Sequence, residues 1–242
     1  MLKVENLKTF NWEGALRGMR NPMNSWAKSD STFDENGNII NVGENDLRLM
    51  KTLFKAGAEH RKYLRQIFVS MDITAPFYLW KDFDTYKIGV TSNSCSTMHK
   101  LTSKPITLDD FSIDDDDDDD DMDVIDNEGE ISSKGFFLNV VANCEMYRQK
   151  YLIYKQKAKL NPNKAKHYNS CAKRYWRKLV QLLPSAYNQK RTITMNYENV
   201  FNIIHQRQNH KLSEFHTLCD TLKTLPYVQE LLNTLDKKEI KQ

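Results

Sequence analysis

An asparagine, an arginine and a histidine in the last quarter of the chain have the spacing of a ligand-binding surface. A helix is predicted to begin near Asn196, and at about 100° per residue Arg207 lies only about 20° around the helix axis from it. His210 lies on the same side. Arginine offers a forked set of donors and asparagine offers both a donor and an acceptor, so this set could grip a planar, anionic ligand such as a nucleotide. A solvated helix face has the same pattern, and both interpretations stay open at this point.

A second polar group precedes the middle of the chain. Asn93, Ser94, Ser96 and Thr97 follow an aromatic-rich segment that is predicted to be helical. Small hydroxyl residues after a helix can bind phosphate through side-chain and backbone donors, although a polar turn has the same composition. Cys95 has no recognisable base nearby in the sequence, so a nucleophilic thiol is not favoured.

Other chemistries lack their sequence patterns. The chain contains no HExxH, no Cys/His quartet, no GxGxxG, no P-loop and no GxSxG, so we expect no metal site. The four cysteines are widely spaced, which is typical of free thiols in a reducing compartment, and we expect a cytoplasmic protein. No apolar run approaches the roughly 20 residues of a membrane span, so no membrane partner is expected.

The formal net charge of +3 conceals an uneven distribution. Residues 109–130 hold fourteen Asp and Glu and no Lys or Arg, so the rest of the chain has 35 basic and 18 acidic residues. A basic body suggests an anionic partner, either a nucleotide or nucleic acid, although a solvated basic surface is an equal alternative. Nucleic acid is the less favoured partner, because the tyrosines between 147 and 175 fall at the helical spacing of core residues.

The remaining pattern predicts an α/β or α+β fold, in which long helices cover a central sheet. We expect one domain over residues 1–242, with residues 104–134 as a disordered acidic insertion around the eight consecutive aspartates at 114–121. Strands are predicted at 4–11 and 64–73, and a loop or hairpin at 29–43. Helices are predicted at 13–20, 45–56, from the Ala75-Pro76 pair to about Lys87, and at 136–160, 164–182 and 196–223.

Two segments carry ordered motifs: Ala75-Pro76, Thr85-Tyr86-Lys87, Asn93 and Ser96 in the first, and Leu183-Pro184, Thr194-Met195-Asn196, Asn202 and Arg207 in the second. Their order and spacing resemble those of the flavin-dependent thymidylate synthase (ThyX) family. That family has an Ala-Pro pair, a helix leading to an Arg-His-Arg signature, and then an Asn and a Ser. Later it has a Leu-Pro pair at a fixed distance before Thr-x-Asn, followed by a second Asn and a nucleotide-binding Arg. The motifs of this chain match these in the same order, and Asn93 and Ser96 match with one inserted residue.

The resemblance implies a homotetramer that methylates dUMP to dTMP, with methylenetetrahydrofolate and NADPH as co-substrates and reduced FAD as cofactor. It also implies roles for single residues. Arg207 and Ser96 would be catalytic, and Ser96, Arg207 and His210 would bind the substrate. The flavin would be bound by Thr85, Tyr86, Lys87, Asn93, Asn196 and Asn202.

The chain departs from the family pattern at three places. The signature position keeps one positive charge, Lys87, and Glu198 stands where the family has a second helix arginine. The family has a pocket histidine before its Ala-Pro pair; the nearest histidine in this chain is His60, which lies several residues away from that position. Two alternatives therefore stay open: a non-catalytic nucleotide-binding relative that senses or sequesters nucleotides, and a nucleic-acid-binding protein whose acidic run shields its basic body.

Overall fold

The structure, a computed structural model, describes residues 2–113 and 133–235. The chain divides into two compact units. The sheet unit comprises Leu2–Thr74, Leu79–Ser94 and the chain from Lys190 onward, and the hairpin unit comprises Ala75–Tyr78 and Cys95–Gln189. None of the described helices combines the length and apolar composition that a bilayer-spanning segment needs.

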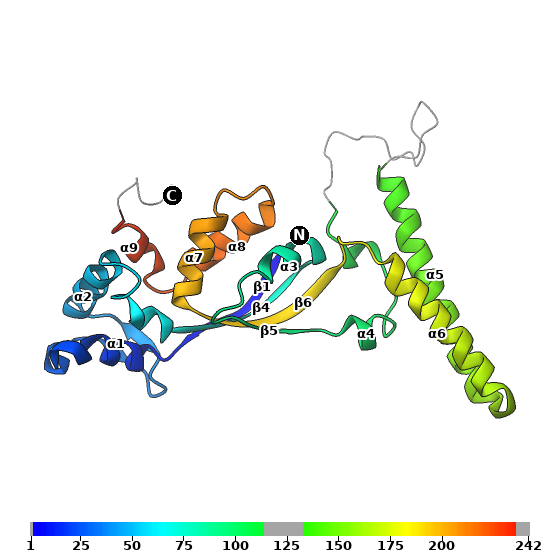
Figure 1. The fold of residues 1–242 in the computed structure, drawn as a ribbon, viewed down its shortest axis with the longest axis horizontal. Coiled ribbons are helices and arrows are strands. Elements are labelled where there is room, and N and C mark those ends of the chain that lie inside the picture. The colour runs from blue at the N-terminus through cyan, green and yellow to red at the C-terminus, as the bar shows by residue number, and fades with distance from the viewer. Residues whose placement is uncertain (1, 114–132, 236–242) are drawn as a thin grey trace. The chain divides into compact units, whose positions relative to one another are not determined.

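A four-stranded sheet forms the base of the sheet unit (Figure 1). Its order is β1 (Lys3–Phe10), β4 (Phe68–Pro76), β6 (Asn188–Asn196) and β5 (Thr91–Ser94). β1 runs antiparallel to β4, with Val4 opposite Ile73, and β5 runs antiparallel to β6, with Thr91 opposite Thr194. Alternate residues of β4, from Val69 to Ala75, are buried, because successive side chains of a strand point to opposite faces. The predicted mixed fold and the edge strand at 4–11 are confirmed.

Two details of the strand prediction were wrong. The strand predicted from 64 begins only at Phe68, because Lys62–Arg65 forms a 3₁₀ turn that buries Tyr63, whose hydroxyl donates to the Met50 carbonyl at 3.0 Å. The strands β5 and β6 were not predicted at all. Most side chains of β6 are polar, and its buried apolar residues are only Ile193 and Met195. Two such positions are too few to give a recognisable alternation of apolar and polar residues.

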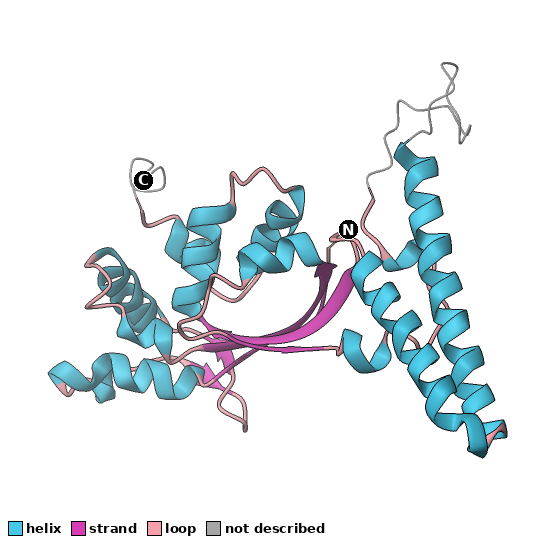
Figure 2. Cartoon of the chain, turned by 45° about the vertical axis from the view of Figure 1, so that its right-hand side comes forward, coloured by secondary structure: helices cyan, strands magenta, loops and turns pink. Residues whose placement is uncertain are grey.

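Helices α7 and α8 lie on one face of the sheet (Figure 1 and Figure 2). α7 spans Tyr197–Arg207 and α8 spans Ser213–Lys223, which confirms the helical prediction for this region. The Asn196 side chain accepts from the Asn199 N–H at 3.0 Å and caps the free donors of the first turn of α7. The other helices of this unit are α1 (Trp12–Arg20), α2 (Glu44–Lys55) and α9 (Val228–Leu232), and the predicted loop at 29–43 contains the hairpin β2 (Thr32–Phe33) and β3 (Ile39–Asn41).

The helix predicted to reach Lys87 is shorter than expected. Pro76 is the last residue of β4, and α3 spans only Phe77–Phe83. The Thr85 hydroxyl donates to the Asp82 carbonyl at 2.7 Å, which closes the end of the helix. The chain then turns through Gly89, whose φ of 73° lies in the left-handed region that favours glycine. The signature position therefore lies on a turn and not on a helix.

In the hairpin unit, α5 (Ser133–Leu160) and α6 (Ala165–Leu182) form an antiparallel pair joined by a 3₁₀ turn at Pro162–Lys164 (Figure 2). This confirms the two predicted helices and the break at Asn161-Pro162, where the proline cannot donate within a helix. The short helix α4 spans Thr97–Lys100.

The prediction of a disordered insertion was wrong for residues 104–113. Ile106 and Phe111 are buried in a cluster with residues of α5 and α6, and a 3₁₀ turn at Leu108–Asp110 is closed by a capping box from Thr107. These two apolar side chains, eight and three positions before the aspartate run, thus bury enough surface to order this stretch. The aspartates at 114–121 lie outside the described residues.

Candidate functional site

Arg207 is held in place by aromatic residues at the end of α7. Its Nε donates to the Tyr86 hydroxyl at 3.0 Å, and that hydroxyl donates to Oε1 of Gln206 at 2.9 Å. The guanidinium also lies 4.9 Å from the ring centroid of Phe215 and 5.6 Å from that of Tyr86. These contacts fix the Nε side of the fork, whereas the Nη donors form no hydrogen bond within the described part of the chain.

A carboxylate that sequence reasoning missed lies beside this arginine. Oδ2 of Asp82 is 3.8 Å from Nη1 of Arg207 and 3.4 Å from Nε2 of His210, and the His210 ring packs on Phe215 at 4.8 Å. The positions four residues before and after Arg207 are Ile203 and Lys211, so its own helix offers no carboxylate there. The structure supplies one from α3, 125 positions earlier in the chain, which no local pattern signals.

Burial of the phenol raises the pKa of Tyr86, although the neighbouring Arg207 acts in the opposite direction. The hydroxyl therefore stays protonated at neutral pH, which allows it to accept from Arg207 and donate to Gln206 at the same time. Three residues predicted for the site, Tyr86, Arg207 and His210, thus lie together in the sheet unit.

Other predicted site residues make contacts within the protein. The Asn196 side chain caps α7, and Asn199, its partner in the cap, donates from Nδ2 to the Ile88 carbonyl at 2.9 Å. A side chain at Gly89 would place its Cβ 2.8 Å from Nδ2 of Asn196, so the turn and the helix cap fit closely. The asparagine cap thus fastens the turn that carries the signature position.

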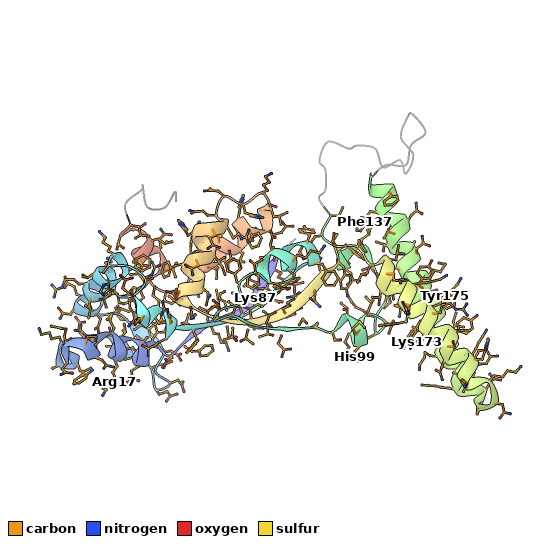
Figure 3. The ribbon with its side chains drawn as sticks, in the orientation of Figure 1. Arg17, Lys87, His99, Phe137, Lys173 and Tyr175 are labelled. Carbon is orange, nitrogen blue, oxygen red and sulfur yellow. The ribbon has the colours of Figure 1, made fainter. Side chains whose placement is uncertain are left out.

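The remaining signature and strand residues are exposed. Lys87, labelled in Figure 3, lies on the turn. It is exposed and forms no ion pair with the described residues. Asn93 lies on the edge strand β5, opposite Thr192. Ser96 belongs to the hairpin unit, where its hydroxyl accepts from the His99 N–H at 3.3 Å and caps α4.

Asn202 lines a cavity of about 810 Å³ on another flank of α7, five positions and about 140° away from Arg207. This volume is within the range of small-molecule sites. Two aromatic rings, Phe54 and Phe201, form part of the wall with centroids 4.6 Å apart. The basic lining residues are Lys55, Arg61, His205 and Lys223, and no described Asp or Glu lines the cavity.

Arg61 contributes a positive charge to this cavity that no described carboxylate compensates. Its guanidinium lies 5.4 Å from the Phe54 ring, and its Nε is buried without an acceptor among the described residues. Lys223, in contrast, already pairs with Asp220 at 2.9 Å. A buried donor without a partner is costly, so the cavity has the chemistry of an anion site. Sequence reasoning missed Arg61 because its neighbours Lys55 and Phe201 are brought to it only by the fold.

The carboxylate of Glu198, which stands at the position of a family arginine, is already paired within the protein. Its carboxylate accepts from Nε of Arg65 at 2.6 Å and from Nη2 of Arg65 at 3.1 Å. This two-point ion pair neutralises the glutamate on the surface of the sheet unit.

The described residues contain no group of three or more His, Cys, Asp or Glu side chains placed to hold a metal ion. The arrangement around α7 can instead bind anions and hydrogen-bond a planar polar ring.

Thymidylate synthase X from Helicobacter pylori, crystallised with FAD and dUMP, aligns with 100% of this chain over 100% of its own, at a TM-score of 0.60 and 15% identity. A second structure of the H. pylori flavin-dependent thymidylate synthase ThyX, complexed with FAD and dUMP, aligns with 97% of this chain over 100% of its own, at a TM-score of 0.58 and 14% identity. The chain has the ThyX fold.

A UMP/dUMP methylase, PolB from Streptomyces cacaoi bound with 5-Br dUMP, shares this ThyX fold. It aligns with 97% of this chain over 96% of its own, at a TM-score of 0.55 and 11% identity. No family model matches the sequence, and no curated protein matches it. At 11–15% identity these structures establish the architecture, so the activity must be argued from the residues themselves.

Proposed function

We propose that this chain binds a pyrimidine nucleotide, dUMP or a close relative, and methylates it as flavin-dependent thymidylate synthases do. The observation that carries the proposal is Arg207, which occupies the nucleotide-binding position of the resemblance and whose Nη donors form no hydrogen bond with the described residues. A guanidinium already oriented by Tyr86 and Phe215 loses little freedom when it hydrogen-bonds a ligand. Both H. pylori ThyX and PolB have structures with dUMP or a dUMP analogue, which supports this ligand class.

Within this proposal, Arg207 binds and polarises the pyrimidine ring. Donors aimed at a carbonyl oxygen stabilise the negative charge that develops there when the ring becomes nucleophilic at C5. His210 and Tyr86 border the same position and orient the ring. The cavity beside Asn202 and Arg61 has the volume and positive charge for an anionic co-substrate such as methylenetetrahydrofolate.

The signature residues do not fit the role of holding the phosphates of FAD. Thr85 uses its hydroxyl on the Asp82 carbonyl, and Tyr86 uses its hydroxyl on Arg207 and Gln206. Only Lys87 remains as a free cation, whereas phosphate groups are held best by several charge-assisted hydrogen bonds. This observation favours a second candidate function, a non-catalytic relative that binds the nucleotide without flavin.

A visible absorption spectrum of the purified protein, before and after addition of FAD and dUMP, separates the two functions. A flavin band that dUMP perturbs would support the synthase, and thymidylate formation from dUMP would be assayed next. Binding of dUMP by calorimetry without any bound flavin would support the nucleotide binder. Absence of dUMP binding with and without FAD would refute both.

A homotetramer, implied by the resemblance, is part of the same proposal. The exposed apolar residues of α5 include Phe136, Leu152, Ile153 and Leu160, between 41% and 72% accessible. Ile153 and Leu160, seven positions apart, lie on one side of the helix, and covering them would favour association of copies. Light scattering on the eluting protein tests it, and a monomer mass at about micromolar concentration would refute it.

A further inference from the structure

The helical pair of the hairpin unit carries a large excess of positive charge. Residues 135–182 contain eleven Lys and Arg and a single acidic residue, Glu145. That glutamate is already paired, because it accepts from Nε of Arg148 at 2.7 Å and from Nη2 at 2.8 Å. The other ten cations form no ion pair within the described part of the chain. Their charge is available to an anionic partner.

Tyrosines and lysines alternate along the line where α5 and α6 meet. The Tyr154 and Tyr175 rings stack at 5.5 Å with an interplanar angle of 14°, and Tyr147 and Tyr168 extend the row at 6.3 Å on either side. Figure 3 marks Tyr175 and Lys173 on α6. We call this the tyrosine–lysine seam; its members are Tyr147, Lys150, Tyr154, Lys157, Tyr168, Tyr175 and Lys178.

The ammonium groups of the seam are held against the rings. Nζ of Lys150 lies 5.3 Å from the centroid of Tyr175, and Nζ of Lys157 lies 5.3 Å from that of Tyr154. Lys178 lies 5.7 Å and 5.8 Å from two of the same rings. Lys150 and Lys157 are seven positions apart, so their charges repeat about 10 Å along α5. Contact with an aromatic face restricts each lysine and forms a regular row of cations.

We propose that the tyrosine–lysine seam binds the phosphate backbone of nucleic acid without base specificity. Lysine is depleted in the cores of protein–protein interfaces but is a principal contact to phosphate, so the composition of the seam favours nucleic acid over a protein partner. The half-buried tyrosines offer ring edges beside the cations, as in surfaces that follow a single strand. This site lies wholly within the hairpin unit and does not depend on Arg207 or on the proposed methylation.

The test replaces the three seam lysines with glutamine in the full chain, as K150Q/K157Q/K178Q. Fluorescence anisotropy follows binding to a labelled single strand of about 30 nucleotides and to the matching duplex, between about 50 and 300 mM NaCl. For the single strand, loss of three phosphate contacts reduces the slope of log K against log[salt] by about 2, and weakens binding about 100-fold at about 0.1 M salt. The variant K150R/K157R/K178R keeps the charges and is expected to bind like wild type.

The matched control, K8Q/K28Q/K62Q, removes the same charge from exposed lysines of the sheet unit. Equal weakening in this control would show that net charge alone acts, and would overturn the seam as a site. So would wild-type binding without salt dependence, an unchanged slope in the triple glutamine variant, or binding to anionic vesicles but to neither nucleic acid. R207A is expected to retain nucleic-acid binding, which separates a failure here from a failure of the nucleotide proposal.

Discussion

Replacement of Arg207 by alanine is the most direct perturbation of the nucleotide site. The Nη donors of Arg207 form no hydrogen bond with the described residues, although Nη1 lies 3.8 Å from Oδ2 of Asp82. We expect two of these donors to contact the pyrimidine nucleotide. Loss of a two-point, charge-assisted contact costs about 3 kcal/mol, which corresponds to a roughly 100-fold rise in Kd for dUMP. Because the side chain is only 18% exposed and packs on Phe215 and Tyr86, the melting temperature is measured beside the affinity to separate lost binding from lost folding.

Tyr86→Phe refines the same prediction. The phenylalanine keeps the ring but removes the hydroxyl that accepts from Nε of Arg207, so the guanidinium loses its orientation and not its charge. We expect a loss of about 1.4 kcal/mol, or a tenfold weaker Kd. Arg207→Lys should give an intermediate loss, since an ammonium cannot bridge the hydroxyl and the ligand with one planar fork.

Isothermal titration calorimetry with dUMP measures these affinities. Arg48→Ala is the matched control, because Arg48 is exposed on α2 and donates to Asn45 in its own first turn. An Arg207→Ala protein that is folded and binds dUMP as wild type does would refute the reasoning. Equal loss in Arg48→Ala would also refute it, because the effect would then come from net charge.

Three further perturbations test the packing and the electrostatics. In the native protein the buried Asp46 carboxylate accepts from Nε of the buried Arg20 at 2.6 Å. Asp46→Ala leaves this guanidinium buried without its carboxylate, so the free energy of unfolding measured in urea titrations should fall by about 3–5 kcal/mol. The hydrogen bonds from Arg148 lower the pKa of Glu145 from 4.5 to about 2. Because the pKa is lower in the folded state than in the unfolded state, the ionised Glu145 stabilises the protein above pH 4.5, and this stability is lost as the pH falls toward 2. We expect a loss of about 2 kcal/mol between about pH 6 and pH 2, and a smaller one in Glu145→Gln; an identical pH profile in that variant would contradict it. Of the four cysteines, Cys95 is exposed and the other three are buried, so the reaction with a disulfide reagent should show one fast phase that corresponds to one thiol. Cys95→Ser should abolish this fast phase, and its persistence in the variant would place a second thiol at the surface.

Local patterns predicted the helices of this protein well. α1, α2, α5 and α6 were placed within a few residues from apolar periodicity and from the proline at 162, since helix hydrogen bonds join residues four apart. The error at α3 has a local cause that periodicity does not register, because the Thr85 hydroxyl ends the helix four residues before Lys87.

Strands and charges were harder to predict, because their partners are distant in the sequence. The sequence of β6 is mostly polar and gives no strand pattern, but the segment forms a strand because β4 and β5 pair with it on its two sides. Glu198 stands where the family has an arginine, which suggested a reversed charge in the site, yet Arg65, 133 positions earlier, neutralises it. The excess of lysine between 135 and 182 was visible in the sequence, but its order along a row of stacked tyrosines was not.

The sequence by itself determined the helical framework, the basic body and the order of motifs that resembles ThyX. Those properties depend on residues near one another or on composition alone. The tertiary structure decided which predicted site residues meet: Tyr86 contacts Arg207 across 121 positions, whereas Asn196 caps a helix and Asn202 lines a separate cavity. A hydrogen bond needs two groups within about 3 Å, and only the packing of α3 and the following turn against α7 and α8 brings these groups that close.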